Sequence, residues 1–100
     1  MVIRTVYVKL DDAHANPAER TRLGEVSRER LAAVPGVTSV KVGQPADDGA
    51  LAAWDLLLMV HFDRIEDVEP YRVHPLHLAY LDEVLNPVAV VKKAWNFEVG

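Results

Sequence analysis

The pattern of apolar and polar positions divides the chain into four strand-like segments and the helical segments between them. Residues 2–10, 37–42, 53–62 and 88–99 are rich in β-branched, aliphatic and aromatic side chains, as is typical of β-strands. The third of these segments has the strongest strand pattern of the chain. The sequence therefore predicts a sheet of four strands.

The first helical segment lies between the first two predicted strands. Asn16 is a favourable N-cap, Pro17 suits the first helical position, and Glu19 can reach back to complete a capping box. The pair Pro35-Gly36 cannot continue a helix. We therefore predict a helix that begins after Asn16 and ends before Pro35.

A second helical region follows the third predicted strand. Residues 63–66 repeat the capping-box pattern and should start this region. Pro70 should break or kink it, because proline has no N–H to donate and its ring clashes with the preceding turn. A further helix can begin at Pro75, with His74 as its N-cap, and run to about Leu85.

The predicted elements follow the order β-α-β-β-α-β. Strands two and three are joined by residues 43–49, which contain Gly, Pro and Asp and are predicted to be a loop and the most mobile segment. This order is that of the ferredoxin-like fold, an α+β architecture with helices on one face of an antiparallel sheet. The length fits a single domain over residues 1–100.

The predicted sheet is apolar on both faces, although two helices can cover only one of them. In the third strand, Leu56, Leu58 and Val60 alternate with Leu57 and Met59, and the first and last strands show a similar pattern. Large uncovered apolar patches are unusual in soluble monomers. We therefore expect a homodimer in which two sheets pack face to face as a dimeric α+β barrel. The alternative is a monomer with an unusually apolar sheet.

Composition and charge exclude several classes of protein. The net charge is −4 and the Lys and Arg residues are scattered, which argues against a nucleic-acid surface. Cysteine is absent, so disulfides and thiolate chemistry are excluded. No apolar run is long enough to span a membrane and no signal peptide is recognisable, so we expect a cytoplasmic protein without a membrane partner.

The segment 71–77 carries the most suggestive chemistry. His77 falls in the first turn of the last helix, where its imidazole can face the sheet and exchange a proton with an acidic carbon or an oxyanion. The positive end of the helix favours its neutral form. Tyr71, with an ordinary pKa of about 10, stays protonated and can donate to an enolate oxygen. The alternative is that both side chains only pack the helix onto the sheet.

Other candidate residues give weaker signals. Asp11, Asp12 and His14 supply oxygen and nitrogen donors, but no helix or strand fixes their spacing and we predict no metal site there. His61 ends the third strand and is expected at the rim of the sheet. Further candidates for lining a cavity are Tyr7, Trp54, Trp95 and Asn96.

Four short motifs, taken together, resemble the stress-responsive A/B barrel domain family, known as Dabb. The resemblance covers nearly the whole chain. Its marks are Val8-Lys9-Leu10 at the end of the first strand, Pro35-Gly36-Val37 between helix and second strand, the apolar third strand ending in Phe62, and Tyr71-x-x-His74-Pro75-x-His77 entering the last helix.

The resemblance implies a ferredoxin-like subunit that pairs with its twin to form a barrel with an internal cavity. Some family members are stress proteins without a known reaction, and others are polyketide cyclases, such as olivetolic acid cyclase, that work without metal or cofactor. In olivetolic acid cyclase the acid/base groups correspond to Tyr71 and His77. The first strand of that cyclase also carries a histidine. Counted from Lys9 that position is Arg4 here, and counted from the start it is Thr5.

Three functions follow from this reading. The first is a polyketide cyclase-like lyase or isomerase that acts on a hydrophobic carbonyl compound in the barrel cavity without metal or cofactor. The second is a non-catalytic stress-response or small-ligand-binding dimer. The third is a cofactor-free monooxygenase of the antibiotic-biosynthesis type. The predicted catalytic residues are Tyr71 and His77, and the predicted substrate-binding residues are Tyr7, Arg4, His74 and Trp95.

Overall fold

A computed structural model describes all residues 1–100, and its strands and main helices follow the predicted order. The strands are β1 (Val2–Leu10), β2 (Ser39–Gly43), β3 (Leu56–Phe62) and β4 (Ala89–Glu98). The helices are α1 (Pro17–Ala32), α2 (Asp48–Ala53), α3 (Val68–Arg72) and α4 (Pro75–Tyr80). A 3-10 turn, Ile65–Asp67, precedes α3, and a π-helical turn, Leu81–Leu85, continues α4.

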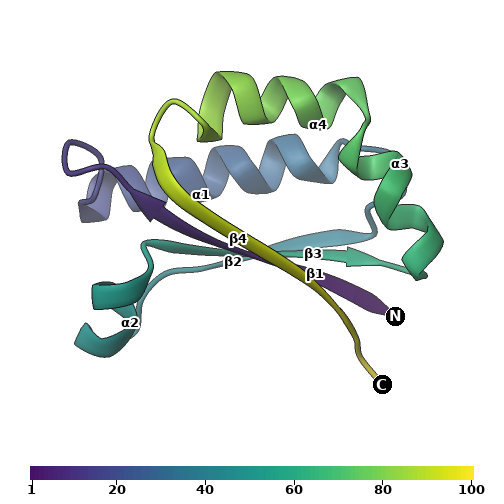
Figure 1. The fold of residues 1–100 in the computed structure, drawn as a ribbon, viewed down its shortest axis with the longest axis horizontal. Helices are drawn as coiled ribbons and strands as arrows, with labels where there is room; N and C mark the ends of the chain where they lie inside the picture. Colours follow the sequence, from purple (N-terminus) through teal and green to yellow (C-terminus); the bar gives the residue numbers. More distant parts are fainter.

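The four strands form one antiparallel sheet in the order β2-β3-β1-β4. Figure 1 shows α1 and α4 lying over one face of this sheet, while α2 lies at one end of the sheet on its other side. Residues directly opposite each other in neighbouring strands share a face, so Val6, Leu58 and Ala94 all point toward the helices. The predicted α+β, ferredoxin-like fold is confirmed.

The start of α1 confirms the predicted N-cap but not the capping box. The Asn16 side chain accepts a hydrogen bond from the Glu19 N–H at 3.0 Å, and Pro17 occupies the first helical position. The Glu19 carboxylate does not reach back; it accepts from Arg22 Nε at 2.7 Å, because a cation one turn ahead offers a charge-assisted bond. After the helix, Gly36 adopts a φ of 92°, which glycine adopts at no steric cost.

The region between β3 and α4 departs from the sequence prediction. Pro70 lies inside α3 as its third residue, where the backbone N–H has no intrahelical acceptor in any helix, so proline removes nothing there. The prediction that Pro70 breaks the helix is therefore wrong. The capping box at residues 63–66 is also wrong, because Arg64 occupies the N-cap of the 3-10 turn and forms no side-chain cap.

Helix α2 was not predicted; it begins within the predicted loop at residues 43–49 and extends to the first residue of the predicted third strand. The Asp47 carboxylate accepts from the Ala50 N–H at 2.8 Å and caps this helix, which Leu51 and three alanines help to form. Strand β3 consequently begins at Leu56, three residues later than predicted. None of the four helices has the length and apolar character needed to cross a membrane.

The core fills the space between the helices and the sheet. Leu58, Val60 and Phe62 from β3 are buried against Leu23 and Leu31 from α1. The opposite face of the sheet, here called the open face, carries the alternate residues of each strand. Two of its aromatic side chains are exposed, Trp95 at 50% and Phe97 at 53%. The predicted apolar character of both faces is confirmed.

Candidate functional site

A cavity of about 290 Å³ lies between the helix-covered face of the sheet and the segment from α3 to the π-helical turn. This helix-side cavity is at the lower end of the size range of small-molecule sites. It combines an apolar wall with cationic and titratable groups. Its lining residues are Arg4, Val6, Tyr71, Arg72, His77, Leu78, Leu81, Leu85, Lys92 and Ala94.

Strand alternation and the break between two helices bring these residues together. Val6 lies directly opposite Ala94 in the pairing of β1 with β4, so one edge of the sheet forms the floor of the cavity. The chain turns between α3 and α4, and this turn places the rings of Tyr71 and His77 with centroids 4.4 Å apart. The motif that spans the turn thus delivers both predicted catalytic side chains to one cavity. This cavity lies between the sheet and the helices, so the predicted location in the barrel cavity between two sheets is wrong.

His74 has a structural role in this turn. Its Nδ1 accepts a hydrogen bond from the Leu76 N–H at 3.0 Å, and its backbone is extended, as expected for a residue that precedes proline. The predicted N-cap of the last helix is confirmed. His74 does not line the helix-side cavity.

The hydrogen bond of His77 determines which of its ring nitrogens is free. Nδ1 lies 2.9 Å from the carbonyl oxygen of Arg72, which can only accept, so Nδ1 carries a proton. In the neutral imidazole, Nε2 then has the free lone pair. Burial lowers the pKa of His77. The hydrogen bond to the Arg72 carbonyl opposes this, and the nearby charges of Arg4, Arg72 and Lys92 add to the lowering. The neutral form, expected from the helix end, is favoured here mainly by burial.

Tyr71 is a buried phenol whose hydroxyl has no hydrogen-bond partner within the chain. It is 1% exposed, and its ring packs edge-on against Phe62 at a centroid distance of 5.1 Å. Burial raises the pKa of Tyr71 well above its ordinary value. Tyr80 is equally buried, but its hydroxyl lies 2.6 Å from Ser27 Oγ. The free hydroxyl at the cavity is therefore specific to Tyr71.

Arg4, and not Thr5, is the first-strand residue that faces Tyr71 and His77. Arg4 lines the cavity, and its Nη1 donates to Asn96 Oδ1 at 3.0 Å. Thr5 points to the open face, where its hydroxyl donates to the Trp95 carbonyl at 3.3 Å. Of the two first-strand positions that the sequence leaves open, Arg4 is therefore the one at the cavity.

Two further cations of the cavity, Arg72 and Lys92, were not predicted from the sequence. Lys92 is directly opposite Val8, whose side chain is buried under the helices, so the strand register alone could have placed Lys92 on that face. Arg72 directly follows Tyr71 at the end of α3, and its position depends on where the helix stops. Because Pro70 was expected to break the helix, the position of Arg72 at the helix end could not be predicted.

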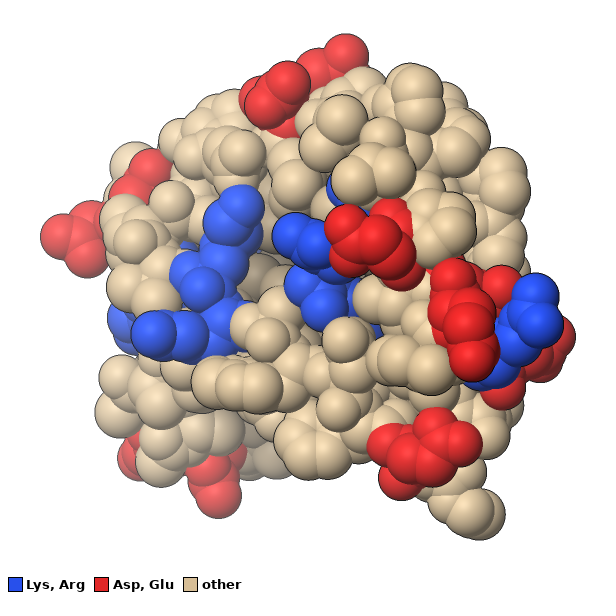
Figure 2. Space-filling view, turned by 45° about the vertical axis from the view of Figure 1, so that its right-hand side comes forward, with Lys and Arg blue, Asp and Glu red and all other residues tan.

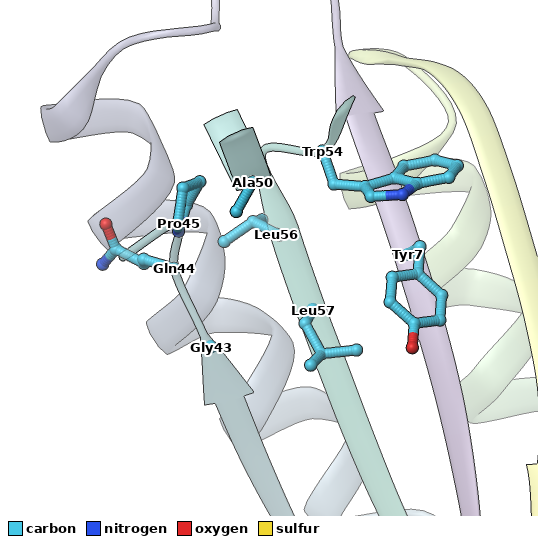
Figure 3. Close-up of a pocket in the computed structure, with 8 residues that line it drawn as sticks. All are labelled: Tyr7, Gly43, Gln44, Pro45, Ala50, Trp54, Leu56 and Leu57. Carbon is cyan, nitrogen blue, oxygen red and sulfur yellow. The ribbon is translucent and has the colours of Figure 1, made fainter. Parts of the chain in front are cut away.

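Tyr7 and Trp95 lie on the open face and do not line the helix-side cavity. The Tyr7 ring packs against Trp54 and Trp95, with centroid distances of 5.6 Å and 6.0 Å. A shallower hollow of about 160 Å³ lies beside Tyr7. Figure 3 shows Tyr7, Trp54 and Leu57 at this hollow, which also borders α2. The predicted site residues are therefore divided between the two sides of the sheet.

The remaining candidates do not form a metal site. His14 Nδ1 lies 2.7 Å from Asp11 Oδ1, a local pair in the loop after β1. No group of three His, Asp or Glu side chains is placed to hold a metal ion. His61 is buried at 7% exposure rather than at an exposed rim, and its Nδ1 has no hydrogen-bond partner within the chain.

Comparison with protein families finds one match, the stress-responsive A/B barrel domain, over residues 2–94. This region contains every residue of the helix-side cavity. Comparison with curated proteins finds no match.

Comparison with solved structures finds the same fold in several proteins of low sequence identity. A Dabb-family protein with a ferredoxin-like fold from Mesorhizobium loti is 19% identical, with a TM-score of 0.79 over 99% of this chain and 97% of that chain. A dimeric protein of unknown function from Bacteroides fragilis is 24% identical, with a TM-score of 0.72 over 98% and 95%. SnoaB, a cofactor-independent oxygenase from Streptomyces nogalater, is 11% identical, with a TM-score of 0.72 over 98% and 91%.

Proposed function

This chain belongs to the stress-responsive A/B barrel domain family, and we propose that it is a cofactor-independent enzyme that moves a proton at the carbon next to a carbonyl group. The helix-side cavity is its active site, with His77 as base and Tyr71 as hydrogen-bond donor. The observation that supports this most is the pairing, in one cavity, of a free imidazole lone pair with the unpartnered hydroxyl of an otherwise buried tyrosine. The reaction class is that of a polyketide cyclase-like lyase or isomerase.

His77 performs the first step of the proposed reaction. Its Nε2 lone pair takes a proton from the α-carbon of the bound carbonyl compound, and the electrons of the broken C–H bond form the C=C bond of an enolate. The carbonyl of Arg72 holds Nδ1–H throughout, which fixes the tautomer and the orientation of the ring.

Tyr71 stabilises the enolate oxygen that this step creates. Its high pKa keeps the hydroxyl protonated at neutral pH, so it donates a hydrogen bond and does not compete as an anion. If His77 returns the proton to the same carbon, the result is exchange of the α-hydrogen; if it delivers the proton to a conjugated carbon, the double bond moves and the compound is isomerised. The enolate carbon can instead add to a second carbonyl, which closes a ring, and the new alkoxide then takes the proton from His77. None of these paths transfers electrons to or from a cofactor, so we propose that no cofactor is used.

We also propose that the chain forms a homodimer through its open face. Exposed apolar side chains gather there, among them Val91, Trp95 and Phe97. The similar structure from B. fragilis is described as dimeric. A second copy would cover the open face and leave the helix-side cavity on the outside of each sheet, so the two subunits would hold separate active sites.

Exchange of α-protons for deuterium tests the proposed reaction without knowledge of the natural substrate. The probe is 4-oxooctanoate in deuterium oxide, followed by proton NMR. The chain should accelerate exchange at the carbons beside the ketone. His77→Gln should reduce the catalysed rate by about 10²–10⁴-fold, because glutamine can still donate to the Arg72 carbonyl but cannot act as a base.

His14→Gln is the matched control, since it removes a histidine outside the cavity. Equal exchange rates in the wild type and His77→Gln would discard the catalytic role of His77. Binding of the probe without any catalysed exchange would favour the non-catalytic, ligand-binding function.

A further inference from the structure

Arg4 differs from the other arginines of the chain because it is half-buried and has no carboxylate within 4.0 Å. Five arginines lie within 4.0 Å of a carboxylate: Arg20, Arg22, Arg30, Arg64 and Arg72. Arg28 has none, but it is exposed to water. Arg4 is half-buried, and its guanidinium bonds only to the neutral amide of Asn96. The nearest acidic influence on Arg4 is Glu69, which forms its ion pair with Arg72 instead. A half-buried cation with no carboxylate in contact is stabilised by a ligand that supplies an anion.

The rest of the cavity adds to this positive charge. Lys92 bonds to the neutral amide of Asn86. Arg72 has a carboxylate partner, Glu69 Oε2 at 2.6 Å, which offsets its charge. The cavity therefore keeps a surplus of cations in a chain whose net charge is −4. Figure 2 shows Lys and Arg side chains gathered around a hollow near the middle of the view, while Asp and Glu lie mainly to the right and at the margins.

An apolar wall faces these cations, so the best ligand has one anionic end and one apolar end. Leu78, Leu81 and Leu85 line the helix side of the cavity, and Val6 and Ala94 line its floor. The volume of about 290 Å³ suits a compact molecule with a short hydrocarbon part. Inorganic phosphate would leave this wall in contact with water, whereas an aliphatic acid would cover it.

We infer that the substrate carries a carboxylate that binds to Arg4, next to the carbonyl that reacts at His77 and Tyr71. The substrate class is thus a small oxo acid with an apolar chain. The planar guanidinium suits the two oxygens of a carboxylate, and the Asn96 amide holds it in place. This inference rests on the proposed function for the carbonyl group, while the carboxylate site depends on Arg4 alone.

A bound carboxylate should also change the titration of His77. The charged groups that face His77 are Arg4 on β1, Arg72 at the end of α3 and Lys92 on β4, all positive. An anion placed among them stabilises the imidazolium and raises the pKa of His77 in the complex. By linkage, the acid should then bind more tightly as the pH falls toward the pKa of free His77.

The test compares 4-oxooctanoate with 4-oxooctanamide, which has the same shape and no charge. We expect the acid to bind about 10–100-fold more tightly in calorimetry, as for a hydrogen bond to a charged group. Arg4→Gln should remove this preference, and the exposed Arg28→Gln should keep it. Arg4→Gln should unfold at the same temperature as the wild type or higher, because it removes an unpaired half-buried charge.

Three results would overturn the inference: equal binding of acid and amide by the wild type, an unchanged preference in Arg4→Gln, or displacement of the acid by an equal concentration of inorganic phosphate. The wild-type comparison and the pKa of His77 with and without acid do not depend on any variant. The two proposals fail separately. Preferential binding of the acid without proton exchange would contradict the proposed enzymatic function but support the carboxylate site. Equal rates of exchange for acid and amide would support the enzymatic function but contradict the carboxylate site.

Discussion

The two faces of the sheet differ in chemistry, although the same strands supply both. Toward the helices, β1 and β4 place Arg4, Val6 and Lys92, which line a cavity with two titratable rings. On the open face they place Tyr7 and Trp95 in an aromatic cluster that carries no His, Asp or Glu. A period of two residues thus lets one strand build a reactive cavity on one side and an apolar association surface on the other.

The largest expected effect is the loss of the proposed dimer when charges are introduced on the open face. Two carboxylates introduced by Trp95→Asp with Phe97→Asp would be buried in the proposed dimer, at a cost on the order of 4 kcal/mol, or about a thousandfold in the dissociation constant. Sedimentation velocity over a range of concentrations should show a dimer for the wild type and a monomer for the double variant.

The matched control places the same charges on two similarly exposed apolar residues, one at the end of α3 and one in the first turn of α4. Val73 and Leu76 are 60% and 47% exposed, and Val73→Asp with Leu76→Asp should leave the dimer intact. A wild-type chain that stays monomeric at every concentration would contradict the proposed role of the open face.

A smaller effect is expected from removal of the free hydroxyl in the helix-side cavity. Tyr71→Phe keeps the ring packing against Phe62 but takes away the donor to the enolate oxygen. The catalysed α-proton exchange should fall by about 10²-fold. Stability should change little, because the hydroxyl has no partner within the chain. Loss of stability with unchanged exchange would indicate a purely structural role for Tyr71.

Tyr80→Phe should show the opposite behaviour, with a still smaller effect. This change leaves Ser27 Oγ without its 2.6 Å hydrogen bond in the core. The free energy of unfolding should fall by about 1 kcal/mol in a denaturant titration. The exchange rate should remain within about twofold of wild type, because Tyr80 does not line the cavity. A large loss of exchange in a folded Tyr80→Phe variant would contradict a structural role for Tyr80 and a catalytic role for Tyr71 alone.

The smallest effect is the displacement of the pH profile. Because the pKa of His77 is lowered in the folded chain, the base form persists below the ordinary value of 6.5. With the uncharged 4-oxooctanamide as the probe, which places no anion beside His77, the exchange rate should therefore stay level as the pH falls through 6.5 and decline only at lower pH. The free energy of unfolding should also decrease as the pH falls. As the pH falls, His77 takes up a proton in the unfolded chain before it does so in the folded chain, so its contribution to stability is lost from about pH 6.5 downward. A rate that declines already above pH 6.5 would contradict this.

The fold was predictable because its signals are local or periodic. The strands were visible as apolar segments, and Asn16 and His74 cap α1 and α4 as their side-chain chemistry indicates. The errors occurred where neighbouring structure decides between local options. Asp47 is a favourable N-cap residue, but no helix was predicted after it. The effect of Pro70 on a helix depends on how far it lies from the helix start.

The site was predictable only in part, because the sequence does not say which alternate positions face the helices. The helix entry gave Tyr71 and His77. The choice between Arg4 and Thr5 needed the register of β1, which fixes one of them in the cavity and the other on the open face. Tyr7 and Trp95 were suggested by their aromatic character, which does not distinguish a substrate cavity from an association surface.

The protonation of His77 tests the central claim most directly, since the proposed reaction requires a free Nε2. Nitrogen-15 NMR of the imidazole rings, with His77 identified by the signals lost in His77→Gln, reports which nitrogen carries the proton and how it titrates. The structure predicts a neutral ring with its proton on Nδ1, bonded to the Arg72 carbonyl, and a pKa below 6.5. A ring with its proton on Nε2, or a pKa above 6.5, would contradict the assignment of His77 as the base.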